Sequence, residues 1–184
     1  MKGLILCGGE SKRAGTDKGL KLENGKTWAE IMNQKLIDLG LSVKVSINSS
    51  QITAYENYFA KADLIIDDVS IPGPLRGILS AHKQFPDGNW MVLACDLIDM
   101  QLQTMKQLME SFKINEGFDF YVYKNEKRYQ PFCGIYTANG LNKLLSTYQN
   151  KQEENYSMQH VFDSFKTYAI PIAEEDSSFK NYNK

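Results

Sequence analysis

Short runs of apolar residues alternate along this chain with longer segments in which apolar positions recur at helical spacing. Apolar runs of roughly four to eight residues that end at polar or glycine-rich segments are typical of strands buried on both faces of a sheet. The strands expected from this pattern are residues 2–7, 42–47, 63–66, 90–94, 118–123, 133–136 and 168–172.

The intervening segments have the periodicity of amphipathic helices. In residues 27–39, Trp28, Met32 and Leu36 fall on one face, and Gly40 follows where a left-handed residue commonly ends a helix. Asp99 is expected to cap a helix that begins near Leu102. The further helices expected are 51–59, 75–84, 102–112, 140–148 and 157–165.

Strands that alternate with helices predict βαβ crossovers and a mostly parallel sheet covered on both faces. We therefore expect an α/β fold, a three-layer sandwich with a Rossmann-like sheet. Polar residues 124–127 separate two strand-like runs, which predicts an antiparallel hairpin at the sheet edge. A chain of 184 residues is long enough for one full core, so residues 1–184 are expected to form a single domain.

Composition and charge limit the kinds of molecule that the chain is expected to bind. Lys and Arg total 21 against 22 Asp and Glu, so a net charge of −1 gives no global attraction to nucleic acid or to a membrane surface. The apolar run Trp90–Cys95 is far shorter than the roughly 20 residues of a membrane span. The 3 cysteines fit neither a paired disulfide framework nor a close metal-binding pair, and we expect a reducing, cytoplasmic setting.

Residues 6–19 begin at the end of the first expected strand and form a long glycine-rich segment. Glycines let backbone amides approach a ligand, and Lys12, Arg13 and Lys18 supply cations for a polyphosphate. The segment matches neither the P-loop pattern nor the dinucleotide-binding pattern. Composition alone leaves two interpretations, a triphosphate-binding loop or a solvated basic loop.

Asp96 directly follows the apolar strand 90–94, at the edge where α/β sheets bind ligands. A carboxylate there is a candidate ligand for Mg²⁺, which commonly takes one or two carboxylates and completes its shell with water and phosphate oxygens. The alternative is a turn or helix-capping residue, a role that Asp99 fits better.

The glycine-rich segment resembles the signature of nucleotidyltransferases related to molybdenum cofactor guanylyltransferase, Leu-x-Gly-Gly-x-Ser-x-Arg-x-Gly-x-Asp-Lys. The fixed positions of that signature are all present here, as Leu6, Gly8, Gly9, Ser11, Arg13, Gly15, Asp17 and Lys18. The resemblance implies a sheet of the nucleotide-diphospho-sugar transferase type, with the nucleotide at the carboxyl ends of the strands.

The resemblance extends over most of the chain. Residues 72–77 are similar to the family's Pro-Gly-Pro-Leu-x-Gly loop, Asp68 matches its acidic nucleotide contact, and Asn48 matches its guanine-contacting asparagine. On their own, Asp68 and Asn48 are also ordinary loop residues. Two departures are clear. Ile98 stands where the family has proline, and the Asn-x-Asn segment, Asn181 and Asn183, lies at the very end of the chain.

The resemblance implies transfer of GMP from GTP to molybdenum-molybdopterin cofactor, with release of pyrophosphate and with Mg²⁺ bound by Asp96. It implies Lys18, Arg13 and Asp96 as catalytic residues. The nucleotide contacts that it implies are Leu6, Cys7, Gly8, Gly9, Lys18, Asn48, Asp68 and Asp96.

Two other functions stay open from the sequence. One is a cytidylyltransferase or another nucleotidyltransferase of the same fold, although relatives that use CTP tend to have Ala-Gly where this chain has Gly8-Gly9. The other is a nucleotide-binding regulator without catalysis. The partners expected are GTP and molybdopterin cofactor, with transient contact to cofactor-delivery proteins or apo-molybdoenzymes.

Overall fold

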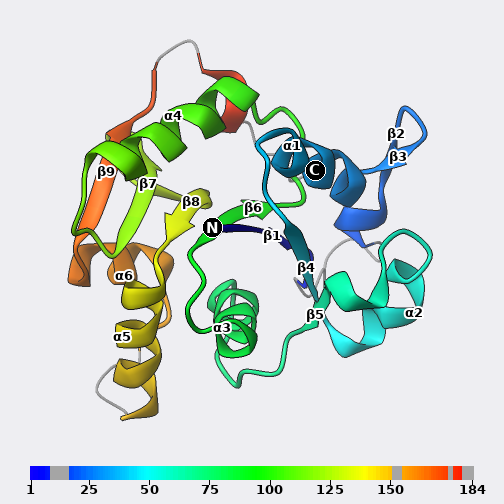
Figure 1. Cartoon of the computed structure of the whole chain (residues 1–184), viewed down its shortest axis with the longest axis horizontal. Coiled ribbons are helices and arrows are strands. Elements are labelled where there is room, and N and C mark those ends of the chain that lie inside the picture. Colours follow the sequence, from blue (N-terminus) through cyan, green and yellow to red (C-terminus); the bar gives the residue numbers. More distant parts are fainter. Residues whose placement is uncertain (9–16, 151–154, 174–175, 180–184) are drawn as a thin grey trace.

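The computed structural model describes residues 1–8, 17–150, 155–173 and 176–179. A seven-stranded sheet has the order β5-β4-β1-β6-β8-β7-β9, and β2 and β3 form a separate hairpin (Figure 1). The strands are β1 (Lys2–Leu6), β2 (Leu22–Glu23), β3 (Lys26–Thr27), β4 (Val43–Ile47), β5 (Leu64–Ile66), β6 (Trp90–Ala94), β7 (Phe120–Lys124), β8 (Tyr129–Tyr136) and β9 (Thr167–Pro171). The helices are α1 (Trp28–Asp38), α2 (Ile52–Tyr55), α3 (Leu75–Gln84), α4 (Leu102–Ile114), α5 (Ala138–Gln149) and α6 (Met158–Ser164).

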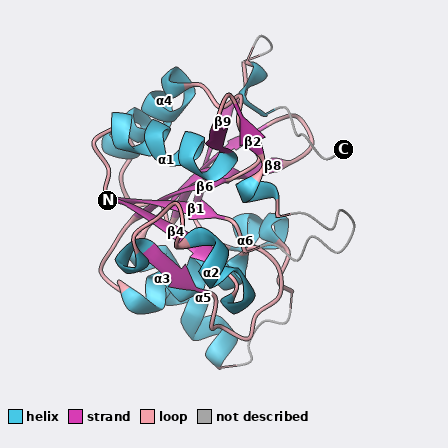
Figure 2. Cartoon of the chain, turned by 90° about the vertical axis from the view of Figure 1, so that its right-hand side faces the viewer, coloured by secondary structure: helices cyan, strands magenta, loops and turns pink. Residues whose placement is uncertain are grey.

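The sheet separates two cores, which gives the expected three layers. Successive residues of β6 point to opposite sides, since Met91 and Leu93 lie in one core and Val92 lies in the other. Helices α1 and α4 cover the first side, and α3, α5 and α6 cover the second (Figure 2). No helix in the described part of the chain is long and apolar enough to cross a membrane.

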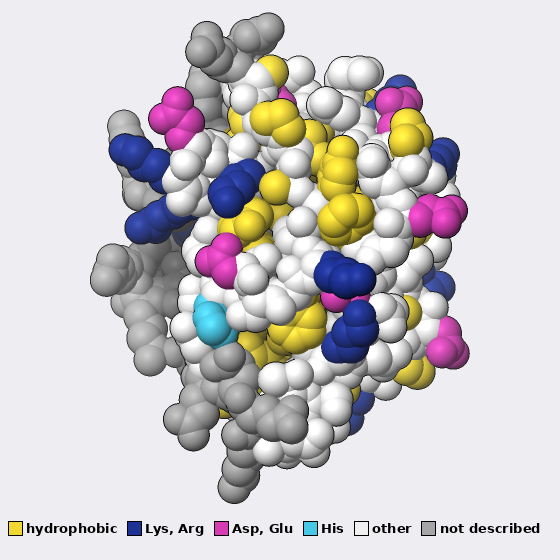
Figure 3. Space-filling model, turned by 90° about the vertical axis from the view of Figure 1, so that its left-hand side faces the viewer, with side chains coloured by type: hydrophobic (Ala, Val, Ile, Leu, Met, Phe, Trp, Pro, Cys, Tyr) yellow, Lys and Arg dark blue, Asp and Glu magenta, His cyan; other side chains and the backbone are white. Residues whose placement is uncertain are grey.

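The antiparallel segment is present but lies inside the sheet. Strands β5, β4, β1 and β6 are parallel, whereas β8 pairs antiparallel with both β6 and β7. β9 then pairs parallel with β7 and forms the edge, so the expectation of an edge hairpin is corrected. On the face beyond β9, hydrophobic side chains are interspersed with charged ones (Figure 3).

Helix ends explain where the sequence pattern succeeded and failed. α1 begins with a capping box between Thr27 and Glu30, and Gly40 adopts φ +77° after it as expected. The expectation that Asp99 caps α4 is wrong. The N-cap is Gln101, whose backbone N–H donates to Ser178 Oγ at 3.0 Å, so the C-terminal segment caps this helix.

Other segments differ from the pattern in length. α2 ends after one turn at Tyr55, although a helix to residue 59 was expected. β8 starts at Tyr129, four positions before the expected strand. The β2–β3 hairpin was not predicted, although its Asn24-Gly25 turn has the positive φ angles, 51° and 79°, that such a dipeptide favours.

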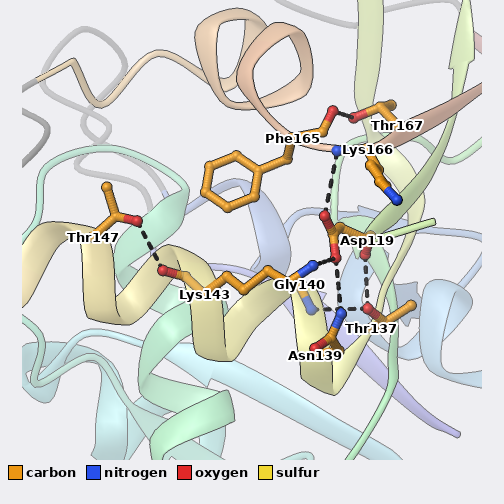
Figure 4. A network of polar contacts seen from close by, with 9 residues as sticks. All are labelled: Asp119, Thr137, Asn139, Gly140, Lys143, Thr147, Phe165, Lys166 and Thr167. Atoms are coloured by element: carbon orange, nitrogen blue, oxygen red, sulfur yellow. Dashed lines mark hydrogen bonds and ion pairs between the residues drawn. The ribbon is translucent and has the colours of Figure 1, made fainter. Parts of the chain in front are cut away.

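A buried carboxylate fastens three distant segments together at the amino end of β7 (Figure 4). Asp119 Oδ1 accepts from Lys143 Nζ at 2.7 Å and from Asn139 Nδ2 at 3.0 Å, and Oδ2 accepts from the backbone N–H of Lys166 at 3.3 Å. The Asp119 side chain is only 4% exposed. The network therefore joins β7 to the start of α5 and to the segment that leads into β9.

Candidate functional site

Four parallel strands deliver the candidate residues to one edge of the sheet. Gly8 lies just beyond β1, Asn48 beyond β4, Asp67 beyond β5 and Asp96 beyond β6. The strand pairing aligns these strand ends, because Leu6 pairs with both Ser46 and Ala94, and Ile47 pairs with Ile66. The carboxyl edge of a parallel sheet is the usual ligand site of α/β folds.

Lys18 and Asp96 meet at this edge, although 78 positions separate them in sequence. Lys18 Nζ lies 3.1 Å from Asp96 Oδ2, with side-chain exposures of 29% and 16%. Two sequence-predicted site residues are thus brought together. An ammonium and a carboxylate at the rim of the sheet can attract the phosphates and the cation of a nucleotide respectively.

Lys18 is held in place by the residue before it. Asp17 Oδ1 accepts from Gly19 N at 2.9 Å, which caps the 3₁₀ turn Lys18–Leu20. Tyr55 donates its hydroxyl to the same oxygen at 3.0 Å, and Gln51 Nε2 donates to Asp17 Oδ2. Asp17 therefore attaches the Asp17-Lys18 end of the signature to Tyr55 of α2 and to Gln51 in the turn before α2.

Asn48 and Gln51 hold the backbone that follows β1. Asn48 Nδ2 donates to Gly8 O at 2.7 Å, and Gln51 Nε2 donates to Cys7 O at 3.2 Å. Sequence reasoning found Asn48 but missed Gln51. Its spacing, three residues after Asn48, is that of a capping box and could have identified it. In the structure Gln51 Oε1 accepts from Asn48 N at 2.7 Å, as in such a box.

The two aspartates after β5 have different environments. Asp68 is exposed and its Oδ2 lies 2.8 Å from Lys83 Nζ of α3; the hydrogen bond from Lys83 lowers the pKa of Asp68. Asp67 is half-buried, and its Oδ1 accepts from Ser46 Oγ at 2.7 Å. Burial raises the pKa of Asp67 to about 6. The carboxylate that lies against Gly8 is that of Asp67, a residue that sequence reasoning missed.

Cys7 and Cys95 are buried free thiols that face the same core as each other. Burial raises the pKa of the Cys7 thiol well above its ordinary value, and a hydrogen bond with Cys95 adds to the rise. Leu6 O accepts from Cys95 N at 3.3 Å, which extends the β1–β6 pairing. These side chains therefore pack beneath the site, and any ligand contact of Cys7 comes from its backbone.

A lysine of α1 supports the segment that follows Asp96. Lys35 Nζ donates to Ile98 O at 2.5 Å and to Met100 O at 2.8 Å. Burial lowers the pKa of Lys35. At Ile98, where the family pattern has a proline, the ammonium group of Lys35 therefore holds the backbone by a hydrogen bond. Sequence reasoning missed Lys35, because the contact spans 63 positions and has no local signal.

Several predicted site residues lie outside the described residues. Gly9 and Arg13 belong to the segment 9–16, and Asn181 and Asn183 belong to 180–184. The last described segment is anchored by Ser178, which is fully buried, and by Phe179, whose ring lies 5.1 Å from that of Tyr123.

Asp96 fits a divalent cation bound together with phosphates. In the described ranges, no group of three or more His, Cys, Asp or Glu side chains could hold a metal ion alone. Mg²⁺ needs only one or two carboxylates when phosphates and water supply the other oxygens. Asp96 Oδ2 bonds Lys18, and among described residues Oδ1 receives no hydrogen bond. The single carboxylate therefore suits Mg²⁺ in a nucleotide complex.

Comparisons with known proteins agree with this geometry. Residues 3–164 match the model of the MobA-like NTP transferase domain. A curated relative from Geobacillus sp. (strain WCH70), named "Probable molybdenum cofactor guanylyltransferase", is 30% identical over 167 residues, covering 88% of this chain and 84% of that protein.

Solved structures show the same fold. Molybdopterin-guanine dinucleotide biosynthesis protein A from Archaeoglobus fulgidus has a TM-score of 0.79 at 20% identity, covering 100% of this chain and 93% of that chain. A cytidylyltransferase from Leptospira borgpetersenii has a TM-score of 0.69 at 18% identity, covering 97% and 79%. The family match and the 30% identical relative together show that this chain is a nucleotidyltransferase that belongs to the MobA-like NTP transferase family.

Proposed function

We propose that the chain transfers GMP from GTP to molybdenum-molybdopterin cofactor, which forms the guanine dinucleotide and releases pyrophosphate. The observation that carries the proposal is the 3.1 Å contact between Lys18 and Asp96 at the end of a loop with the complete family signature. The name of the Geobacillus relative supports the choice of GTP and of this acceptor.

In this reaction a phosphate oxygen of the pterin attacks the α-phosphorus of GTP. The bond from that phosphorus to the bridging oxygen breaks, and pyrophosphate leaves with the electron pair. No covalent enzyme intermediate is needed, so catalysis rests on positioning and charge neutralisation. Lys18 and Arg13 bind the phosphates, and Asp17 keeps Lys18 oriented through its bond to Gly19.

Asp96 would hold Mg²⁺, which would withdraw charge from the phosphate oxygens. With the nucleotide bound, the Lys18 ammonium would contact the phosphates in place of Asp96. The backbone of Leu6, Cys7 and Gly8 supports the nucleotide, and Gly9, which lies outside the described residues, is proposed as a further nucleotide contact. Asn48 and Asp68 contribute to binding of the guanosine from the ends of β4 and β5.

Localisation and partners follow from this activity. We place the enzyme in the cytoplasm, where Cys7, Cys95 and Cys133 stay reduced, in agreement with their state as free thiols. The small-molecule partners are GTP and molybdopterin cofactor. Proteins that deliver or receive this cofactor are proposed as transient partners.

Calorimetric titration with GTP, CTP and ATP, with and without Mg²⁺, tests the proposal first. We expect Mg²⁺-dependent GTP binding at least about tenfold tighter than that of CTP or ATP. Pyrophosphate release on addition of the pterin acceptor then demonstrates transfer. Preference for CTP would indicate a cytidylyltransferase, and GTP binding without pyrophosphate release would indicate a regulator.

Two variants test the roles at the site. Asp96→Ala should lower Mg²⁺-dependent pyrophosphate release by about a hundredfold or more. Lys18→Ala should weaken GTP binding by about tenfold, because a charge-assisted contact to phosphate is lost. The Lys44–Asp63 ion pair, 2.8 Å apart at β4, provides the matched control. Asp63→Ala should change neither property, and an active Asp96→Ala enzyme would refute the metal assignment.

A further inference from the structure

One side chain joins the two ends of the glycine-rich signature. Gln51 Nε2 donates to Cys7 O at 3.2 Å and to Asp17 Oδ2. Gln51 Oε1 accepts from Asn48 N at 2.7 Å. A glutamine amide has two N–H donors and one carbonyl oxygen, so both donors are used here within the protein and the oxygen also has a partner. Gln51 is therefore placed to hold the chain rather than to bind a ligand.

The partners of Gln51 lie on either side of the central part of the signature. Cys7 directly follows β1, and Asp17 is the N-cap of the turn that carries Lys18. Residues 8–16 separate the two partners, and the argument needs only the described residues that flank 9–16. The two bonds from Gln51 Nε2 therefore fix the end of β1 relative to Lys18.

The 3₁₀ turn after Asp17 also packs closely against this region. A Cβ atom on Gly19 would stand 2.2 Å from Tyr55 Oη and 3.1 Å from Cys7 Sγ, so glycine is needed for this approach. Tyr55, which is fully buried, donates to Asp17 Oδ1, the oxygen that also accepts from Gly19 N. Gln51 bonds the other oxygen of Asp17 and thereby joins the turn to β1.

We propose that Gln51 is a positioning residue for nucleotide binding, whose amide holds the Lys18 ammonium beside Asp96 by joining the turn that carries it to the end of β1. This inference rests on the proposed function. The ammonium lies 3.1 Å from Asp96 Oδ2, so it is already at the carboxyl edge of the sheet. A cation that is held in place loses less conformational entropy when phosphates bind to it.

A double-mutant cycle tests whether Gln51 acts through Lys18. Gln51→Met keeps the length of the side chain and removes its three hydrogen bonds. By calorimetry with Mg²⁺, we expect this change to weaken GTP binding by about fivefold. In a Lys18→Ala background the same change should weaken GTP binding by less than about twofold, because the group that Gln51 positions is gone.

Gln51→Glu separates the bond to Asn48 from the bonds to Cys7 and Asp17. The new carboxylate still accepts from Asn48 N, but it loses both donors and faces the carboxylate of Asp17. At pH 8 we expect GTP binding about fivefold or more weaker than in the wild-type protein. At pH 5.5 a proton shared by the two carboxyl groups restores one bond, and the affinity should return to within about twofold of the wild-type value. Burial raises the pKa of the Cys7 thiol and of the Tyr55 hydroxyl, so neither titrates in this range.

Gln159 provides the matched control. Its Nε2 donates to Tyr129 O at 2.9 Å and its Oε1 accepts from Tyr129 N at 2.9 Å, so it also holds backbone through both ends of its amide. Gln159→Met should leave GTP affinity unchanged at both pH values. The ratio of GTP affinities between Gln51→Met and the wild-type protein should not vary with pH, because methionine does not titrate.

Affinities are compared per folded molecule, and if Gln51→Met does not fold, the pH dependence of Gln51→Glu decides alone. Wild-type affinity in Gln51→Met, or an equal loss with and without Lys18, would overturn the inference and leave the proposed function intact. A deficit in Gln51→Glu that persists at pH 5.5 would overturn it as well, since the role would then be structural. A wild-type protein that binds no GTP would refute both.

Discussion

At the residue scale, Asp67 and Asp68 show how packing decides what a side chain can do. Both are aspartates in one loop, yet burial raises the pKa of Asp67 while Lys83 lowers that of Asp68. The sequence resemblance pointed to Asp68. The surroundings of Asp67 include Gly8, which follows β1, and Ser46 of β4, so no local pattern in residues 67 and 68 could reveal the difference.

This environment predicts that Asp67 destabilises the folded protein. Its folded-state pKa of about 6 exceeds the ordinary value of 3.8. The free energy of unfolding therefore falls as the pH rises from 3.8 to about 6, and the loss stays constant at higher pH. Asp67→Asn keeps an acceptor for Ser46 and removes the charge. We expect the free energy of unfolding at pH 8 to increase by about 1–2 kcal/mol, allowing for solvent contact of the half-buried group.

Urea denaturation at pH 8 and pH 4.5 measures this effect. The gain from Asp67→Asn should shrink at pH 4.5, where the wild-type carboxyl is mostly protonated. Asp68→Asn serves as control, because its exposed pair with Lys83 should contribute less than about 1 kcal/mol. A loss of stability in Asp67→Asn at pH 8 would show that the charge is needed for folding, against this expectation.

At the element scale, the segment between β6 and α4 depends on α1. The bonds from Lys35 Nζ to Ile98 O and Met100 O fix the backbone that carries Asp96. Lys35→Met removes both bonds and keeps a good helix former in α1. We expect amide hydrogen exchange in residues 97–101 to accelerate by roughly tenfold to a hundredfold.

The same variant should impair catalysis through Asp96. Pyrophosphate release should fall by about tenfold, because the carboxylate is no longer held in one place. Lys44→Met is the matched control, since Lys44 Nζ of β4 also donates to a carbonyl, Ala62 O at 2.8 Å, which precedes β5 and lies outside the segment between β6 and α4. Equal exchange rates in Lys35→Met and the wild-type protein would rule out this positioning role.

The elements themselves were largely predictable because their signals are local. The periodicity of residues 27–39 and the left-handed Gly40 located α1 correctly. The end of α2 and the cap of α4 were not predictable, since the cap is supplied by Ser178, 77 positions away from Gln101. The same reason applies to the site. The glycine-rich segment has a sequence signature, whereas the contacts of Lys35 and Asp67 join distant segments of the chain and leave no local pattern.

At the scale of the whole molecule, the candidate ligand site lies at the carboxyl ends of the strands, and a stabilising polar network lies at their amino ends. Asp96 follows β6, whereas Asp119 precedes β7, which runs parallel to β6 through their shared neighbour β8. The carboxylate of Asp96 lies at the carboxyl edge, with one oxygen that accepts no hydrogen bond from described residues. That of Asp119 lies at the amino edge, fully engaged by Asn139, Lys143 and Lys166.

This division predicts that Asp119→Ala lowers stability without changing the site. Removal of the carboxylate leaves the buried N–H group of Lys166 and the amide of Asn139 without their acceptor. We expect the free energy of unfolding to fall by about 2–4 kcal/mol. Lys143→Ala should cost less than about 1 kcal/mol, since that side chain is 49% exposed.

Calorimetric GTP titration of the folded variant provides the decisive comparison, because each strand end of the site is paired in register independently of Asp119. The affinity for GTP per folded molecule should match that of the wild-type protein at a temperature well below both unfolding transitions. A weakened affinity in Asp119→Ala, with Lys143→Ala unchanged, would mean that strain at the amino edge reaches the carboxyl edge through β7, β8 and β6. In that case the sheet would couple stability to binding rather than separate them.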